Sequence, residues 1–145
     1  MPDPSSTLSA SVPGHVLYRV PYADTDQMGV VYYANYLTYF ERCRNELLRS
    51  TGFTYRELEE RGLGLPVVEA HVAYRAPARY DDLLELSGSV AEARGCRIRI
   101  DCAVSREGQL LATGHTVHCC MDLRSRRPVR VPPELASHAS GGMAR

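Results

Sequence analysis

The chain of 145 residues has the length of one domain and is long enough to bury a core of its own. Hydrophobic residues make up 44% and charged residues 23%, as in ordinary soluble proteins, and no run approaches the roughly 20 apolar residues of a membrane-spanning helix. The 17 basic and 17 acidic residues give a formal net charge of zero, so nothing general in the electrostatics favours nucleic acid or an anionic membrane as a partner.

The two ends of the chain differ in character from its middle. Residues 1–13 are rich in Pro and Ser and lack the basic start and apolar block of a signal peptide, so we expect a disordered N-terminal lead. Residues 136–145 are expected to form a flexible tail. This leaves residues 14–135 as the folded domain.

The first predicted elements are a strand and a long helix, separated by an acidic loop. Residues 15–20 alternate well enough for a strand, and residues 21–32 form the loop. The helix is predicted over residues 33–50 and ends before Gly52. Its apolar face repeats at helical spacing and comprises Tyr33, Tyr36, Leu37, Phe40, Cys43 and Leu47.

A short helix and four strands follow. Thr54, with Glu57 three residues later, predicts a capping box for a helix that reaches Arg61. Alternating patterns then predict strands over residues 67–74, 83–93, 97–105 and 109–121. Turn residues at Gly95 and at Glu107-Gly108 mark two hairpins, and we expect the four strands to form a meander.

The order of these elements indicates an α+β fold. Hairpin links make the sheet antiparallel, and one long helix with a broad apolar face must bury that face against the sheet. The expected architecture is a curved antiparallel sheet of about five strands wrapped around one long helix. The exposed edges of such a sheet favour edge-to-edge pairing into a homodimer or a dimer of dimers.

The segment from residue 19 to residue 36 carries the chemistry of the chain. It places Asp24 and Asp26 in the turn between the first strand and the long helix. A carboxylate that faces the N-terminus of a helix can act as a nucleophile or base, while free N–H groups of the helix end hold an oxyanion. For Asp24 a role in the turn or as a loop cap is favoured over catalysis, and Asn35 is expected to fix the loop by hydrogen bonds.

The cysteines and histidines indicate neither a disulfide framework nor a metal site. The five cysteines are odd in number and form no CxxC pair, which fits small buried side chains in a reducing cytoplasm. Four of the five histidines lie in predicted strands, and none has a partner four residues away on a helix. His71 could face a pocket, although a strand histidine with satisfied hydrogen bonds is the simpler interpretation.

The segment 19–36 resembles the active-site signature of the 4-hydroxybenzoyl-CoA thioesterase family, within the hot-dog-fold superfamily. The matching positions are Arg19-Val20, Thr25, Asp26, Gly29, Val30-Val31, Tyr32 and Asn35-Tyr36. Residues 74–82 are similar to the second landmark of the family, and the resemblance covers roughly residues 14–135. Within the family, the chain resembles the bacterial short-chain acyl-CoA thioesterases whose genes accompany the Tol–Pal envelope system.

The resemblance implies a hot-dog fold and hydrolysis of an acyl-CoA thioester without a cofactor or a metal. Asp26 matches the catalytic acid, which acts as nucleophile or general base, and the backbone N–H of Tyr33 matches the oxyanion donor. Many envelope-associated relatives carry His in place of Tyr33; a tyrosine hydroxyl is a poor base at neutral pH, so its side chain is assigned to the acyl pocket. Tyr22 matches a supporting tyrosine of some relatives. Three loop positions are implied to bind substrate: Gly29, Val30 and Asn35.

Coenzyme A also carries phosphates, and the planar fork of arginine matches phosphate oxygens well. The relatives hold the nucleotide near segments that correspond to those of Arg94, Arg97, Arg127 and Arg130. The resemblance implies that the first three of these bind substrate, at a site shared between subunits. A solvated surface role is the alternative for each arginine.

The sequence therefore predicts a cytoplasmic acyl-CoA thioesterase that works as a homodimer or homotetramer. Thioesters of acyl carrier protein are alternative substrates, and the acyl chain is left open. One rival interpretation is a hot-dog hydratase or dehydratase, whose Asp–His or His–Glu setting is not visible in this chain. The other is a non-catalytic acyl-CoA-binding protein, which would lack the acid that this chain retains at Asp26.

Overall fold

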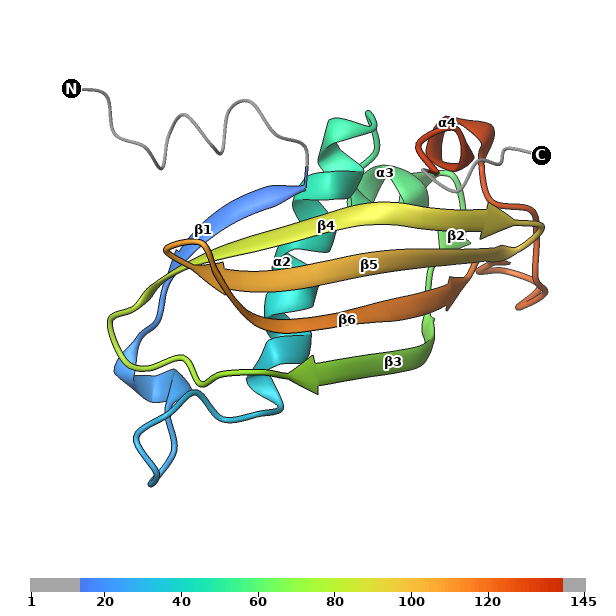
Figure 1. Ribbon diagram of the computed structural model, residues 1–145. Coiled ribbons are helices and arrows are strands. Elements are labelled where there is room, and N and C mark those ends of the chain that lie inside the picture. Colours follow the sequence, from blue (N-terminus) through green and yellow to red (C-terminus); the bar gives the residue numbers. More distant parts are fainter. Residues whose placement is uncertain (1–13, 140–145) are drawn as a thin grey trace.

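The computed structural model describes residues 14–139, in which a curved sheet wraps around one long helix (Figure 1). The predicted lead, residues 1–13, and residues 140–145 of the predicted tail lie outside the described residues. Of the remaining tail positions, Ala136 is the last residue of the short helix α4 (Pro133–Ala136).

Within the described residues, the main sheet has five strands in the order β1-β4-β5-β6-β3, and every neighbouring pair is antiparallel. The strands are β1 (His15–Arg19), β3 (Val67–Tyr74), β4 (Leu83–Arg94), β5 (Arg97–Arg106) and β6 (Gln109–Cys119). Two short strands, β2 (Leu63–Gly64) and β7 (Met121–Asp122), pair with each other separately. The predicted α+β class and the antiparallel five-stranded sheet on one helix are confirmed.

The strand order differs from the predicted meander at one place. Strands β4, β5 and β6 do form a meander, through tight turns in which Gly95 and Glu107-Gly108 have positive φ angles. Strand β3, however, pairs with β6 at the far edge of the sheet instead of with β4. The connection 75–82 passes the ends of β6 and β5 to reach β4 (Figure 1). It is longer than the two to five residues of a tight hairpin, and this length lets it span two strands.

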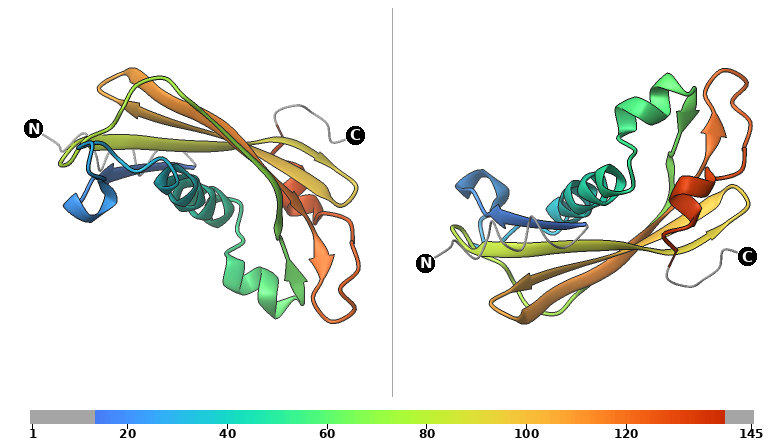
Figure 2. Two further views of the ribbon diagram at one scale, coloured as in Figure 1. Left: turned by 90° about the horizontal axis from the view of Figure 1, so that it is seen from below. Right: turned by 90° about the horizontal axis from the view of Figure 1, so that it is seen from above.

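Helix α2 (Asn35–Ser50) lies across the concave face of the sheet (Figure 2). It starts two residues later than predicted, so Tyr33 precedes the helix and is 62% exposed, and Leu37 is 42% exposed. The prediction that these two belong to the buried face is wrong. The other four predicted positions are buried, and Tyr39, Arg44 and Leu48 join them on the buried face. Its residues are Tyr36, Tyr39, Phe40, Cys43, Arg44, Leu47 and Leu48.

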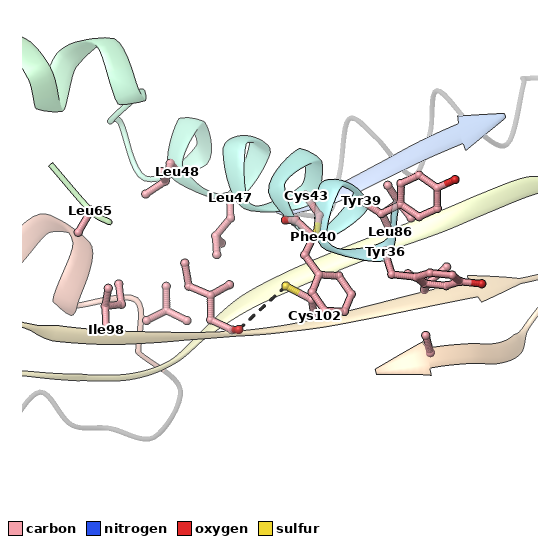
Figure 3. Packing of buried hydrophobic residues seen from close by; sticks show 14 of the residues in the cluster. Tyr36, Tyr39, Phe40, Cys43, Leu47, Leu48, Leu65, Leu86, Ile98 and Cys102 are labelled. Carbon is pink, nitrogen blue, oxygen red and sulfur yellow. Dashed lines mark hydrogen bonds between the residues drawn. The ribbon is translucent and has the colours of Figure 1, made fainter. Parts of the chain in front are cut away.

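Small side chains let the helix approach the sheet closely. Gly88, Cys102 and Gly114 are register neighbours across β4, β5 and β6. Phe40 and Cys43 project from the helix toward this row (Figure 3). Because the row offers little side-chain volume, the Phe40 ring packs directly against the sheet at Gly114.

The second helix, α3 (Tyr55–Glu60), begins as predicted. The Thr54 hydroxyl accepts a hydrogen bond from the backbone N–H of Glu57 at 3.1 Å, which satisfies one of the free donors of the first turn. Tyr55 also accepts a hydrogen bond at its hydroxyl from Nε of Arg44, at 2.8 Å. Arg44 is buried, and this contact gives its guanidinium a partner.

The described chain contains no helix with the length and apolar character that a bilayer crossing requires. All five cysteines are free thiols. Cys43, Cys102 and Cys120 are buried as predicted, whereas Cys96 and Cys119 are only half-buried. Cys96 directly precedes β5, and Cys119 is the last residue of β6.

Candidate functional site

The loop between β1 and α2 folds around Asp24. Oδ2 of its carboxylate accepts hydrogen bonds from the hydroxyls of Tyr18, at 2.6 Å, and Tyr39, at 2.8 Å. Its backbone carbonyl accepts from the N–H of Tyr32 and from Nδ2 of Asn35, both at 2.9 Å. Asp24 thus accepts four hydrogen bonds that hold the loop together, and one of them comes from Asn35.

Asp26 lies in the tight turn that follows. Its backbone N–H donates to the carbonyl of Val30 and its carbonyl accepts from the N–H of Gly29, both at 2.9 Å. Oδ1 of its side chain accepts from the N–H of Met28 at 2.9 Å, and no described residue donates a hydrogen bond to Oδ2. Gly29 has a φ of 79°, a left-handed conformation that glycine adopts without strain. The turn therefore holds the carboxylate by one oxygen and leaves the other available.

Tyr33 lies in the turn directly before helix α2. The helix has Ala34 as its N-cap, without a side-chain cap. The backbone N–H groups of Tyr33 and Ala34 donate to no described residue, whereas that of Asn35 donates to the carbonyl of Tyr32 at 2.9 Å. Two backbone donors are therefore free at the positive end of the helix dipole, as an oxyanion site requires.

Two further tyrosines, Tyr32 and Tyr74, contact Tyr33. The rings of Tyr32 and Tyr33 lie 4.7 Å apart, and the hydroxyl of Tyr74 donates to the carbonyl of Tyr33 at 2.9 Å. The hydrogen bond with Tyr33 and, to a smaller extent, the negative charge of Asp26 raise the pKa of Tyr32.

Tyr22 lies on the surface of the loop. Its side chain is 77% exposed, and its ring packs edge-to-face on Tyr80, with 5.8 Å between the centroids. No described hydrogen bond joins its hydroxyl to Asp26. The structure brings Asp26, Gly29, Val30, Tyr33 and Asn35 into one loop, with Tyr22 at its outer side.

The connection 75–82 braces this loop from the side. The carbonyl of Ala78 accepts from the N–H of Val31 at 2.8 Å, and Val20 exchanges backbone hydrogen bonds with Asp81 and Asp82. The Asp82 carboxylate in turn accepts from Nη1 of Arg106 at 2.7 Å. Partial burial opposes ionisation of Asp82, but the Arg79 N–H and the Arg106 guanidinium outweigh it and lower the pKa of this carboxyl. The signature landmark 74–82 marked this segment, whereas no local signal pointed to Arg106.

The arginines implied to hold a nucleotide lie at the opposite end of the sheet (Figure 1). Arg94 and Arg130 line one cavity of about 320 Å³, between the β4–β5 turn and helix α4. Nη2 of Arg97 pairs with the Glu69 carboxylate at 3.4 Å. Arg127 is exposed in the turn after β7, where its N–H donates to the Ser125 hydroxyl. A single chain does not bring these arginines next to Asp26.

Known proteins resemble the chain over most of its length. A family model described as "Thioesterase-like superfamily" matches residues 20–138. An "Acyl-CoA thioesterase YbgC" of Haemophilus influenzae is 39% identical over 118 residues, which cover 81% of this chain and 87% of the relative. A "1,4-dihydroxy-2-naphthoyl-CoA hydrolase" of Synechococcus elongatus is 30% identical over 118 residues, 80% of this chain and 87% of the relative. The crystal structure of Slr0204, a 1,4-dihydroxy-2-naphthoyl-CoA thioesterase from Synechocystis, superimposes with a TM-score of 0.76 at 29% identity and covers 83% of this chain and 90% of that one.

Proposed function

The chain belongs to the thioesterase-like superfamily and has its hot-dog fold, and from this premise we infer that it is an acyl-CoA thioesterase. It hydrolyses an acyl-CoA thioester to a free carboxylic acid and coenzyme A. One observation supports the location of the chemistry above all others. The same short loop presents an available carboxylate oxygen on Asp26 and two free backbone donors at the start of α2.

We propose that Asp26 acts on the thioester carbonyl in one of two ways. It attacks the carbonyl carbon to give a mixed anhydride that water then hydrolyses, or it takes a proton from the water that attacks directly. In both routes the carbon–sulfur bond breaks, and the sulfur of coenzyme A leaves and is protonated. In both, negative charge develops on the carbonyl oxygen, where the N–H of Tyr33 would stabilise it.

The remaining loop positions are proposed to shape the substrate site. Gly29 and Val30 lie beside Asp26 in the same turn and would contact the thioester end of the substrate. Asn35 would act through the loop that it holds. The exposed ring of Tyr22 is proposed as a supporting group at the outer side of the loop. The side chain of Tyr33 would contribute to the acyl pocket.

The nucleotide of coenzyme A is proposed to bind at the arginine-bearing end of the sheet. Arg94 is favoured there because it shares a cavity with Arg130, and none of the described residues that line this cavity is an acid. Arg97 and Arg127 remain proposed contacts at the rim. Arg97 would have to exchange its ion pair with Glu69 for a phosphate.

We propose that the site is shared between two subunits that pair along β3. Among the described strands β3 pairs only with β6, and its Val67 and Val68 are each 48% exposed. Two-fold symmetry makes the paired strands antiparallel, so the end of one β3 that lies near Tyr33 faces the start of the other. That start belongs to the arginine-bearing end of the sheet. A homodimer, or a homotetramer built from two such dimers, would therefore supply both halves of the site.

Three finer assignments belong to the same proposal. The five free thiols support a cytoplasmic location, where disulfides do not persist. The signature match supports membership of the 4-hydroxybenzoyl-CoA thioesterase branch, near the Tol–Pal-associated enzymes. Thioesters of acyl carrier protein remain an alternative to acyl-CoA. A hydratase would need a partner for its acid, and no described hydrogen bond or ion pair joins Asp26 to a His or Glu side chain.

The decisive experiment is hydrolysis of an acyl-CoA panel with short, long and aromatic acyl groups, followed by release of free thiol. Wild type is compared with Asp26→Asn and with Asp101→Asn, a control on the outer face of β5. We expect Asp26→Asn to lower turnover by orders of magnitude while the fold is kept, and Asp101→Asn to leave turnover unchanged. Near-normal turnover of Asp26→Asn would overturn the catalytic assignment. Tight binding of one acyl-CoA without turnover by wild type would favour a binding protein.

A further inference from the structure

We propose that Asp24, held by Tyr18 and Tyr39, is a positioning residue that fixes the distance between the Asp26 carboxylate and the Tyr33 N–H. The inference rests on the proposed function, because it concerns the geometry of that catalytic loop. Asp24 would not touch the substrate. It would act through the backbone of two limbs of the loop: residues 24–26, which carry the carboxylate, and residues 31–33, which lead to the N–H of Tyr33.

The first step of the argument is the anchoring of the Asp24 side chain. Its two hydroxyl donors come from different elements, Tyr18 from strand β1 and Tyr39 from helix α2, and both reach the same carboxylate oxygen. Tyr39 is only 1% exposed, and its ring lies 5.0 Å from that of Tyr18. A guanidinium, that of Arg42, lies over the Tyr18 ring at 4.4 Å. Asp24 is therefore tied to two rigid parts of the fold.

The protonation of the two tyrosines supports this arrangement. Burial, followed by the hydrogen bond to Asp24 and its negative charge, raises the pKa of Tyr18 to about 12. The same causes in the same order raise the pKa of Tyr39. Both hydroxyls therefore keep their protons around neutral pH and remain donors. Hydrogen bonds to a charged acceptor are also stronger than those between neutral groups.

The second step is the link from Asp24 to the reacting groups. Asp26 is two residues further along the chain, in a limb that bridges back through Thr25 and Val31. The other limb is held because the Asp24 carbonyl accepts from the N–H of Tyr32, the residue directly before Tyr33. The same carbonyl accepts from Asn35 in the first turn of α2. Asp24 thus fixes the position of both limbs relative to strand β1 and helix α2.

The third step is the kinetic consequence. Catalysis depends on attack and on oxyanion stabilisation at the same carbonyl, and a misplacement of about 1 Å can cost on the order of 10²-fold in rate. The oxyanion contact gains its strength in the transition state, so its loss lowers kcat more than it raises KM. A merely structural hydrogen-bond cluster would instead affect stability and leave the turnover of the folded enzyme unchanged.

The hydrogen-bonded group of Asp24, Tyr18 and Tyr39 is called the clamp. The test compares kcat, KM and thermal unfolding of four clamp variants with those of a matched control. Asp24→Ala is expected to lower kcat by up to about 10²-fold with KM within about twofold. Asp24→Asn keeps one acceptor oxygen and should recover part of that loss. The double variant Tyr18→Phe/Tyr39→Phe keeps both rings and should approach Asp24→Ala, while Tyr39→Phe alone falls between. The control Tyr55→Phe loses a 2.8 Å hydrogen bond of similar quality, to Arg44, away from the loop, and should keep the wild-type kcat.

Two results would overturn the positioning role. The first is a lower unfolding temperature in the clamp variants with an unchanged kcat, as in Tyr55→Phe. The second is that Asp24→Asn is as inactive as Asp26→Asn and loses the acidic limb of its pH–rate profile, which would make Asp24 itself the catalytic acid. If Asp24→Ala does not fold, Asp24→Asn and Tyr39→Phe decide by the same criteria.

The failure of the proposed function looks different in the same experiment. Normal turnover of Asp26→Asn, with clamp variants that lose kcat, would contradict the role of Asp26 and leave Asp24 as a determinant of some other catalytic group in the loop. A wild type that hydrolyses no acyl thioester would overturn both the activity and the positioning role.

Discussion

Phe40 in helix α2 lies directly against Gly114 in strand β6: a Cβ atom on the glycine would come within 2.6 Å of ring atom Cε2. The same Cβ atom would clash with the carbonyl oxygen of His71 in the neighbouring strand. Real Cβ atoms do not approach that closely, so glycine is required here for reasons of space. The contact sets how deeply α2 sits in the sheet, and thereby where its N-terminus lies.

Gly114→Ala is therefore expected to destabilise the protein by about 1–3 kcal/mol, the usual cost of overpacking a core. Gly88 is a matched control, because its Cβ atom would meet Sγ of Cys43 at an ordinary 3.4 Å. Gly88→Ala should change stability by less than about 1 kcal/mol. Urea unfolding of both variants measures the difference. Equal midpoints for the two would contradict the close approach of Phe40.

Stability is expected to fall in mild acid because of His118. This histidine is fully buried between the carbonyl of Leu65 and the hydroxyl of Thr116, each 2.9 Å from one ring nitrogen. A carbonyl only accepts, so Nδ1 carries the proton and Nε2 accepts from the threonine. Burial, aided by the positive charge of Arg44, lowers the pKa of His118 despite the opposing effect of the Leu65 carbonyl.

The direction of this pH dependence follows from proton linkage. Below the ordinary histidine pKa of about 6.5 the unfolded chain binds a proton that the folded protein resists. The contribution of His118 is thus fully present above about pH 6.5 and is lost as the pH falls toward its lowered folded value. In His118→Gln, which cannot titrate, the loss of unfolding temperature between about pH 7 and pH 5 should be smaller than in wild type. Parallel curves for the two proteins would rule out His118 as the cause.

The cavity between the β4–β5 turn and α4 predicts which arginines bind the nucleotide. Arg94→Ala and Arg130→Ala should each raise KM for acyl-CoA by roughly tenfold, since a hydrogen bond to a charged group is worth about 1.5–3 kcal/mol. Neither should change KM for short acyl-thiol analogues that lack the nucleotide. Arg127→Ala is expected to act in the same direction, whereas Arg99→Ala, which breaks a pair with Asp101, serves as control. Equal effects on both substrate types would show that these arginines do not hold the phosphates.

The free edge of β3 predicts how subunits associate. Val68→Lys places a charge on the exposed edge and should convert the wild-type assembly into monomers, which light scattering after gel filtration would detect. Leu110→Lys, at a partly exposed position near the start of β6, should leave the assembly intact. If the site is shared, hydrolysis of acyl-CoA should fall together with the dimer. An unaltered assembly of Val68→Lys would exclude pairing along this edge.

Features that depend on neighbouring residues in the chain were predictable from the sequence. The Thr54 cap of α3, the turns of the meander and the bounds of β3 follow from local patterns, and the structure confirms them. The partner of β3 was not predictable in this way. The alternation of a strand defines its two faces, but it carries no information about which strand lies beside it.

The site divides along the same line. The signature led to Asp26 and Tyr33 because their spacing is local. Tyr18 and Tyr39 were missed, since a tyrosine on a strand or helix looks the same in sequence whether its hydroxyl is solvated or donates to a distant carboxylate. The burial of Arg44 has no local signal for a related reason: its partner, Tyr55, belongs to the next helix.

Among residues 14–139, strand β1 has its register partners only in β4, where His15 lies opposite Ser87 and Arg19 opposite Leu83. During synthesis at about 5–20 residues per second, the first strand therefore waits several seconds on the ribosome for its neighbour. Val20, which leads into the loop, likewise waits for Asp82. The loop that carries Asp26 thus gains these supports only after the chain has been made as far as Asp82 and the first half of β4. A nascent chain that ends before residue 83 should have no hydrolytic site to expose to the acyl-CoA pool of the cell.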